Sequence, residues 1–324
     1  MRVKMFPKLA SFGKSESGIR RVIEAWHKFG KAFDIDYIED DSENFDLTVI
    51  HAGTYTRYDY SRPIFAATHG LYFSADYASQ SWEYEANRNV IETVRRASGV
   101  SVPSRWVQEI FQRDMRFSPY IIPHGIEWKD WQGSYDNMGY VLWSKNRAMD
   151  VCDPRPIGEL AKRHTSVPFV TTFVNAQDMR QNIRVIGLQT HPAMKRIVQS
   201  AAVYLSSVKE TFGIGTLEAL AAGVPVLGFS HGGNLIMVEH GVNGYLAKPG
   251  DYDDLAEGLS YCLKHRKTLG DNAREMAKSW TWEAACEKLS VAFKETIEGW
   301  QDQRRPHQVD QSTYQKPVPA EAVG

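Results

Sequence analysis

The segment of the chain richest in residues suited to ligand binding contains two glutamates, Glu210 and Glu218, separated by seven residues. Between them, Gly213 and Gly215 let the backbone turn sharply and bring N–H groups close to a ligand. We expect an Ala-rich helix to follow this turn. The first turn of a helix has unpaired N–H donors and a positive dipole end, which together suit a phosphate or a sugar hydroxyl. The spacing predicts that both carboxylates face a ligand site rather than the core.

The order of elements around the glutamates is informative. A predicted strand at 202–205 precedes them, their helix stops at Gly223, and Val224-Pro225-Val226 begins the next strand. With LEALAAGVPVLG and the later GVNGYLAKPGD, this segment resembles the E-x7-E family-4 retaining glycosyltransferases, which have the GT-B fold. The resemblance covers residues 140–300 well and the N-terminal half loosely.

The resemblance implies a role for each glutamate. Glu210 would bind the hydroxyls of the donor hexose, and Glu218 the ribose hydroxyls of the nucleotide. Phe212, Gly213 and Ile214 would line the sugar pocket through their backbone. The alternative is a surface helix whose two glutamates are solvated.

Two other glycine motifs fail on spacing. Gly13-Lys14-Ser15 is no P-loop, because Lys8 stands where the first glycine is required. Gly213-x-Gly215 is no dinucleotide fingerprint, because Glu218 occupies the third glycine position.

A diphosphate leaving group needs positive charge, because bond cleavage develops negative charge on it. Lys145 and Arg147 follow a predicted strand at 140–143 and are the candidates for this task. The family's Gly-Arg pair followed by Glu-Lys-Gly is missing here, and AMDVCDPRP stands in its place. The alternative is two solvated loop cations.

Further candidates lie at other predicted loop-to-helix junctions. By resemblance, Gly232 and Gly233 would contact the donor's phosphate or sugar, and His69 would lie near the reacting sugar. A lone histidine is more often a structural residue. Gly13 and Gly18 precede or open the first helix and could approach the donor phosphates. The segments 186–191 and 171–173 are expected to recognise the base.

The elements that must position these residues alternate between short apolar runs and helical patterns, which predicts βαβ units and parallel sheets. The fold class is therefore α/β, with two doubly wound Rossmann-like domains facing a central cleft, where ligands bind in such folds. We predict an N-terminal acceptor domain at 1–135, a nucleotide-sugar domain at 136–280, a helix at 281–300 that packs back toward the N-terminal domain, and a disordered tail at 301–324. Early strands are expected at 2–6, 34–38, 47–51 and 64–68, a helix at 81–96, and a buried strand at 120–122.

The composition is that of an ordinary globular protein. The net charge of -1 gives no global attraction to nucleic acid or an anionic membrane. Three widely spaced cysteines fit a reducing compartment, and no apolar run approaches the roughly 20 residues that span a bilayer. The N-terminus shows no signal-peptide pattern. We expect a cytoplasmic protein without membrane insertion.

The resemblance implies transfer with retention, in which the departing diphosphate oxygen accepts the acceptor's proton. No metal or resident cofactor is expected, since Asp251-Tyr-Asp253-Asp254 is interpreted as a helix cap; the donor, a UDP-sugar in preference to a GDP-sugar, is a substrate. The acceptor is open between a glycan, a small metabolite and a hydroxymethylated DNA base. An aromatic and basic run at 55–62 suits stacking on bases or sugars. A sugar epimerase or phosphorylase, or a non-catalytic nucleotide-sugar binding protein, are the alternatives.

Overall fold

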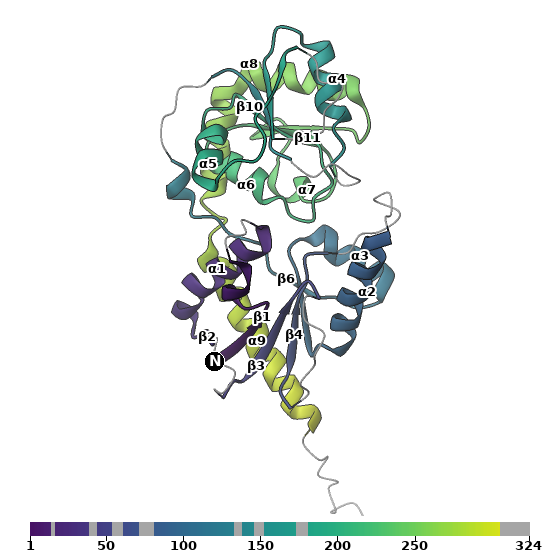
Figure 1. Ribbon diagram of the computed structural model, residues 1–324, viewed down its shortest axis with the longest axis vertical. Coiled ribbons are helices and arrows are strands. Elements are labelled where there is room, and N and C mark those ends of the chain that lie inside the picture. The colour runs from purple at the N-terminus through teal and green to yellow at the C-terminus, as the bar shows by residue number, and fades with distance from the viewer. Residues whose placement is uncertain are drawn as a thin grey trace, which may run out of the picture.

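The computed structural model describes residues 1–13, 17–38, 44–53, 61–70, 81–132, 138–145, 152–172 and 181–304. These residues form two α/β domains stacked along the long axis of the molecule (Figure 1). Each domain has one sheet with helices on both faces.

The N-terminal sheet has six parallel strands in the order β2-β1-β3-β4-β5-β6. The inner strands β3, β4 and β5 are buried along their whole length, because helices cover both faces of a parallel sheet. The strands are β1 (Arg2–Phe6), β2 (Asp36–Ile38), β3 (Leu47–His51), β4 (Ile64–Ala67), β5 (Gly99–Val102) and β6 (Tyr120–Ile121).

The C-terminal sheet repeats this architecture, with six parallel strands in the order β12-β11-β10-β7-β8-β9. Its central strand β10 leads directly into the loop that carries Glu210. The strands are β7 (Val141–Trp143), β8 (Phe169–Thr171), β9 (Ile183–Val185), β10 (Val203–Ser206), β11 (Val226–Phe229) and β12 (Gly244–Ala247).

Helices follow the strands and cover the sheets. Several begin at side-chain caps: Ser17 accepts from the Arg20 N–H, and Ser104 from the Val107 N–H. The α-helices are α1 (Gly18–Gly30), α2 (Ser81–Arg96), α3 (Arg105–Met115), α4 (Arg155–Arg163), α5 (His191–Gln199), α6 (Ile214–Ala221), α7 (Asn234–Met237), α8 (Tyr252–Ala277) and α9 (Trp282–Arg304). Short 3-10 helices occur at Leu9–Phe12, Lys31–Phe33 and Trp128–Trp131.

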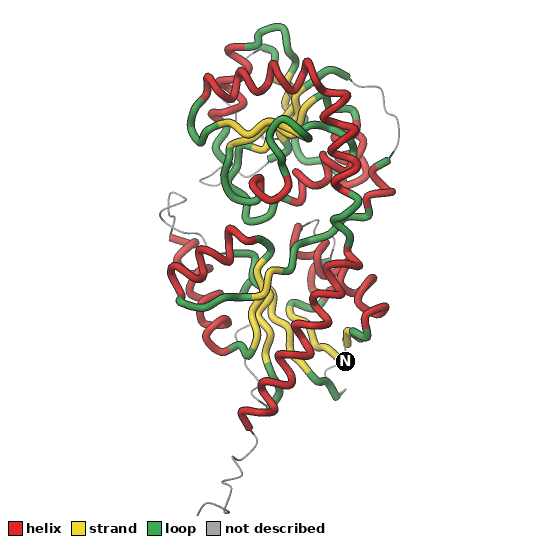
Figure 2. The backbone as a smooth tube through the Cα atoms, turned by 180° about the vertical axis from the view of Figure 1, so that it is seen from behind, coloured by secondary structure: helices red, strands yellow, loops and turns green. Residues whose placement is uncertain are grey.

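The last helix, α9, returns to the N-terminal domain and lies along its sheet (Figure 2). Its buried residues, among them Cys286, Leu289 and Phe293, join the N-terminal core. The ring of Phe293 meets that of Phe65 on β4 edge-on, with centroids 4.8 Å apart. Helix α9 thus completes the core of the N-terminal domain.

The predicted α/β fold of two doubly wound domains is confirmed, and most predicted elements lie within two residues of the observed ones. The prediction of a buried strand at 120–122 was wrong. Strand β6 is the sheet edge, so Tyr120 is exposed and only Ile122, beyond the strand, is buried. Helix α9 continues to Arg304, four residues past the expected end of the helix at 300; residues 305–324 lie outside the described part.

Candidate functional site

The segment 207–213, hereafter the glutamate loop, connects β10 to α6. Gly213 caps α6 with φ +96° and ψ +64°, a left-handed conformation that side chains other than glycine rarely adopt. Below the loop, the Ser206 hydroxyl lies 2.8 Å from Thr216 Oγ1 and 2.8 Å from Asn234 Oδ1. These buried hydrogen bonds connect β10, α6 and α7, and hold both ends of the loop.

Glu210 forms an ion pair with Lys145. Lys145 lies just after β7, the strand that pairs with β10. Burial lowers the pKa of Lys145, but the adjacent Glu210 carboxylate, together with Tyr204 and Cys152, raises it by more in total, so the pKa lies above its ordinary value. The ammonium is therefore fully charged at neutral pH. Next to it, Ser144 Oγ lies 2.8 Å from the hydroxyl of buried Tyr204. Lys145 thus places a positive charge beside Glu210.

Glu218 lies in α6 and is 7% exposed. Its carboxylate accepts a hydrogen bond from the guanidinium of Arg21, a residue of α1 in the other domain. A buried carboxylate is costly unless it is paired, and here the partner comes from across the domain junction. Glu218 therefore points toward α1 of the N-terminal domain.

Gly232 and Gly233 pack directly against the backbone of the glutamate loop. The N–H of Gly233 donates to the Glu210 carbonyl at 2.8 Å. A Cβ on Gly233 would lie 1.8 Å from the Phe212 carbonyl oxygen, and one on Gly232 would lie 2.5 Å from that of Glu210. The Gly233 N–H is thus engaged within the protein, and contact of Gly232 and Gly233 with the phosphate or sugar of a bound nucleotide-sugar stays a prediction. The glycines are needed because two backbone segments touch.

The N-terminal domain holds the same loop from the opposite side. The Ser104 hydroxyl donates to the Thr211 carbonyl at 2.7 Å. Gly70 packs so close to Thr211 that a Cβ there would lie 2.6 Å from the threonine Cγ2. Half-buried His69 is the neighbour of Gly70, so the predicted residue lies at the domain junction.

The side chains of Phe212 and Ile214 pack into the protein interior, so only their backbone groups could line a ligand site. The Phe212 ring is buried between His124 and Trp280, with ring centroids 4.9 Å and 5.7 Å away. Ile214 packs against the cores of both domains. At Gly215, a Cβ would lie 2.5 Å from the Tyr204 hydroxyl, so this position too must be small.

Gly13 and Gly18 flank the start of α1. The Gly13 carbonyl accepts from Arg20 at 2.9 Å, and no atom of the described residues lies within 4 Å of a Cβ built on either glycine. Arg21, one turn further along α1 than Gly18, reaches Glu218. Gly18 therefore lies one helical turn from the residue that pairs with Glu218.

Several sequence candidates lie outside the described residues. These are Arg147, the part of the aromatic and basic run at 55–60, and position 173. In the segment expected to recognise the base, Gln189 donates to the Ile186 carbonyl at 2.6 Å, and Thr190 caps α5. Leu188 is 75% exposed there, so the segment presents an apolar side chain to solvent.

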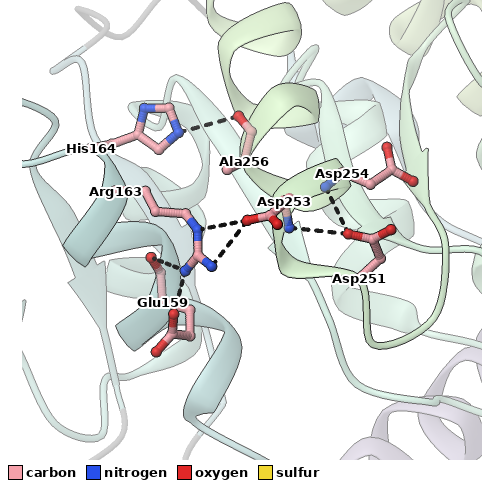
Figure 3. A network of polar contacts seen from close by, with 7 residues as sticks. All are labelled: Glu159, Arg163, His164, Asp251, Asp253, Asp254 and Ala256. Atoms are coloured by element: carbon pink, nitrogen blue, oxygen red, sulfur yellow. Dashed lines mark hydrogen bonds and ion pairs between the residues drawn. The ribbon is translucent and has the colours of Figure 1, made fainter.

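The acidic run at 251–254 is the cap of α8, as predicted. The Asp251 carboxylate accepts from the N–H groups of Asp253 and Asp254 (Figure 3). Asp253 pairs with Arg163 of α4 at 3.1 Å. Asp254 accepts from the Lys248 N–H and the Tyr245 hydroxyl. Within the described part of the chain, no group of three or more His, Cys, Asp or Glu residues could hold a metal ion.

Sequence reasoning did not name Arg21, Tyr204 or His51 as candidates, and it interpreted the segment that contains His124, IIPHGIE, as a structural element. Arg21 follows the predicted glycines in SGIRRV, but its reach across the domains has no local signal. Tyr204 lies on a strand, and its sequence context predicts a core residue. His51 ends a strand and His124 follows one, and a histidine at the end of a strand was the only local indication of a functional residue at these positions.

The chain is similar in sequence and in fold to known proteins. Residues 172–280 match the family model described as glycosyl transferases group 1. The solved structures that resemble the chain include a protein from Anabaena in complex with UDP and glucose, with a TM-score of 0.70 at 14% identity, covering 91% of this chain and 100% of that one. The chain has the GT-B fold. A glycosyltransferase from Rickettsia africae gives a TM-score of 0.66 at 12% identity, covering 92% of this chain and 98% of that one.

The curated relatives match part of the chain. An N-acetyl-alpha-D-glucosaminyl L-malate synthase from Bacillus anthracis is 34% identical over 109 residues, covering 33% of this chain and 28% of the relative. A D-inositol 3-phosphate glycosyltransferase from Kribbella flavida is 32% identical over 149 residues, covering 45% and 32%. The match thus spans a third or less of these relatives. The described helices include none that is both long and apolar enough to cross a membrane.

Proposed function

We propose that this GT-B protein is a retaining, metal-independent glycosyltransferase that moves a hexose from a nucleotide-diphosphate donor to a hydroxyl acceptor. The observation that carries the proposal is the arrangement of Glu210 and Glu218. Glu210 precedes the N-terminus of α6 and Glu218 lies within α6, and each carboxylate pairs with a cation from another part of the chain, Lys145 and Arg21 respectively. Glu210 then binds the sugar hydroxyls, and Glu218 the ribose.

The chemistry follows from charge. The bond between the anomeric carbon and the diphosphate oxygen breaks as the acceptor oxygen bonds to the same face, and the acceptor's proton moves to the departing oxygen. Lys145 and the N-terminus of α6 stabilise the growing negative charge on the diphosphate. The protein's main contribution is positioning, because the leaving group itself takes the proton.

A UDP-sugar is the preferred donor. The similar Anabaena protein was solved with UDP and glucose, which supports this choice over a GDP-sugar. The acceptor is a glycan, a small metabolite or a hydroxymethylated DNA base, bound by the N-terminal domain.

A donor screen by thermal unfolding tests the proposal. A ligand that binds only the folded state stabilises it by about 2.7 kcal/mol at 100 times its Kd. UDP-sugars should raise Tm more than GDP- or ADP-sugars, and Glu218→Gln should abolish the rise. Glu275→Gln, which changes a surface ion pair with Lys278, is the matched control and should keep it. No Tm rise with any nucleotide-sugar contradicts the proposal.

An epimerase is the second candidate, favoured by one observation: His69 is accompanied by two further histidines. Incubation with the donor alone, followed by NMR of the sugar, separates the two functions. An epimerase converts the donor without an acceptor, whereas a transferase releases the nucleotide diphosphate when the acceptor is added. A non-catalytic binding protein would be favoured instead by two results together: the wild-type protein shows no turnover, and the Glu210→Ala variant binds the nucleotide-sugar as well as the wild type does.

A further inference from the structure

Three histidine rings form a column at the carboxyl ends of the N-terminal strands. His51 is the last residue of β3, His69 follows β4, and His124 follows β6. The rings of His51 and His69 are stacked with centroids 5.7 Å apart, and those of His69 and His124 are 5.6 Å apart. His69 is therefore the middle member of the column.

The column runs from the N-terminal core to the glutamate loop. His51 is fully buried, and its ring lies 4.8 Å from that of Trp26 in α1. His124 is 7% exposed and meets the Phe212 ring edge-on at 4.9 Å. Its other aromatic neighbour is Trp282, at 6.1 Å. Movement of His69 is thus restricted from both sides.

The nitrogen atoms of the column are coupled. His51 Nδ1 lies 3.4 Å from His69 Nε2, so one of these two atoms carries the proton and the other accepts it. His69 Nδ1 is then the ring nitrogen that His51 does not engage. The tautomer of His51 consequently decides which nitrogen of His69 donates.

All three rings are neutral at pH 7. Burial lowers the pKa of His69 to about 4. Burial, and then the neighbouring His69, His124 and His27, hold the pKa of His51 well below its ordinary value. Burial and His69 do the same for His124. A neutral ring has one donor and one acceptor, so its orientation and tautomer have chemical consequences.

We propose that His51 and His124 are positioning residues for His69. His51 fixes the tautomer of His69, and His124 holds its ring against the glutamate loop, so that His69 Nδ1 meets a hydroxyl of the bound sugar or acceptor. This inference rests on the proposed glycosyl transfer. It assigns function to two residues that touch no substrate themselves.

Rate measurements test the role of His51. His51→Leu removes the contact and should lower kcat roughly tenfold or more, with the donor KM changed less than about twofold, since misplaced groups lose rate. His51→Asn keeps a polar group near the Nδ1 position and should recover kcat to within about threefold. His164→Leu removes a half-buried histidine of the C-terminal domain, whose ring nitrogen lies 3.2 Å from the Ala256 carbonyl oxygen, and should keep wild-type kcat.

A double-mutant cycle separates positioning from general damage. In a His69→Ala background, His51→Leu should lower kcat by less than about twofold, because the residue it acts through is gone. His124→Phe keeps the ring packing and should stay within about threefold of wild type, while His124→Ala should lose roughly tenfold. Equal losses with and without His69, or wild-type kcat in His51→Leu, would overturn the proposal.

Ring-nitrogen NMR of nitrogen-15 histidine-labelled protein gives a readout independent of turnover. At pH 7, His69 should show one neutral tautomer in the wild type and in His51→Asn, and exchange between tautomers in His51→Leu. A charged or tautomer-averaged His69 in the wild type overturns the positioning role. If NMR shows a single tautomer but no donor yields transfer, the proposed function fails while the assigned geometry holds.

Discussion

Arg21 in α1 and Glu218 in α6 form an ion pair that joins the two domains. The two residues are 197 positions apart in the chain. The glutamate belongs to the motif that resembles a sugar-transferase signature, and the arginine comes from the helix that starts at Gly18. The candidate site is therefore built by both domains, and its stability should depend on the contact between them.

The Arg21–Glu218 pair should contribute measurably to folding. Arg21→Gln leaves a nearly buried carboxylate without its cation and should lower the free energy of unfolding by about 1–3 kcal/mol in urea denaturation. Arg20→Gln is the control: its pair with Glu24 lies within one helix and should cost under about 1 kcal/mol. Additive effects of Arg21→Gln and Glu218→Gln would contradict the coupling.

Lys145 should be needed for catalysis rather than folding. Lys145→Met removes the charge beside Glu210 and should reduce kcat about 100-fold or more, by analogy with the loss of one stabilising donor for transition-state charge. Lys278→Met removes a surface lysine paired with Glu275 and should leave kcat unchanged. Steady-state kinetics with saturating donor measures both; equal rates for the two variants would remove Lys145 from the mechanism.

Gly233 should tolerate no side chain. Gly233→Ala forces the Phe212 backbone away and should destabilise the protein by about 3 kcal/mol, with loss of nucleotide binding. Gly158 in α4 has open space and an ordinary φ, so Gly158→Ala should stabilise by about 0.5–1 kcal/mol. Denaturation and thermal-shift binding compare the two. A Gly233→Ala protein that still binds nucleotide would mean that the loop does not need this support.

Stability should fall as the pH drops below the ordinary histidine range. The pKa of His69 is lowered in the folded state to about 4, so between about pH 6.5 and pH 4 the unfolded state binds the proton more readily. His69→Gln should remove up to about 2 kcal/mol of the stability lost between about pH 7 and pH 5. Urea denaturation at both pH values measures this; an unchanged pH slope contradicts the lowered pKa.

Asp251 should act as a helix cap without a role in catalysis. Asp251→Ala should cost about 1 kcal/mol of stability, and Asp251→Asn much less, because asparagine also caps. Both variants should keep kcat, and EDTA should leave the wild-type rate unchanged. Loss of transfer on chelation, restored by a divalent ion, would contradict the metal-independent proposal.

The fold, and the loop and helix that carry Glu210 and Glu218, could be predicted from residue patterns alone. Alternating apolar runs and helical patterns record which residues are buried along each element, and parallel sheets covered on both faces follow from them. The glycine turn before α6 was also readable, because Gly213 needs a backbone conformation that few other residues adopt.

The contact partners of Glu218 and His69 could be found only from the packing of the two domains. Arg21 reaches Glu218, and His51 and His124 enclose His69, from elements whose local patterns carry no sign of these partners. Likewise, Gly232 and Gly233 follow the sequence rule for a ligand loop but serve a close contact between two backbones. The spacing of residues indicates which side chains are neighbours within one helix or strand. Contacts between elements depend on how the sheets and domains pack, and local sequence patterns do not indicate that packing.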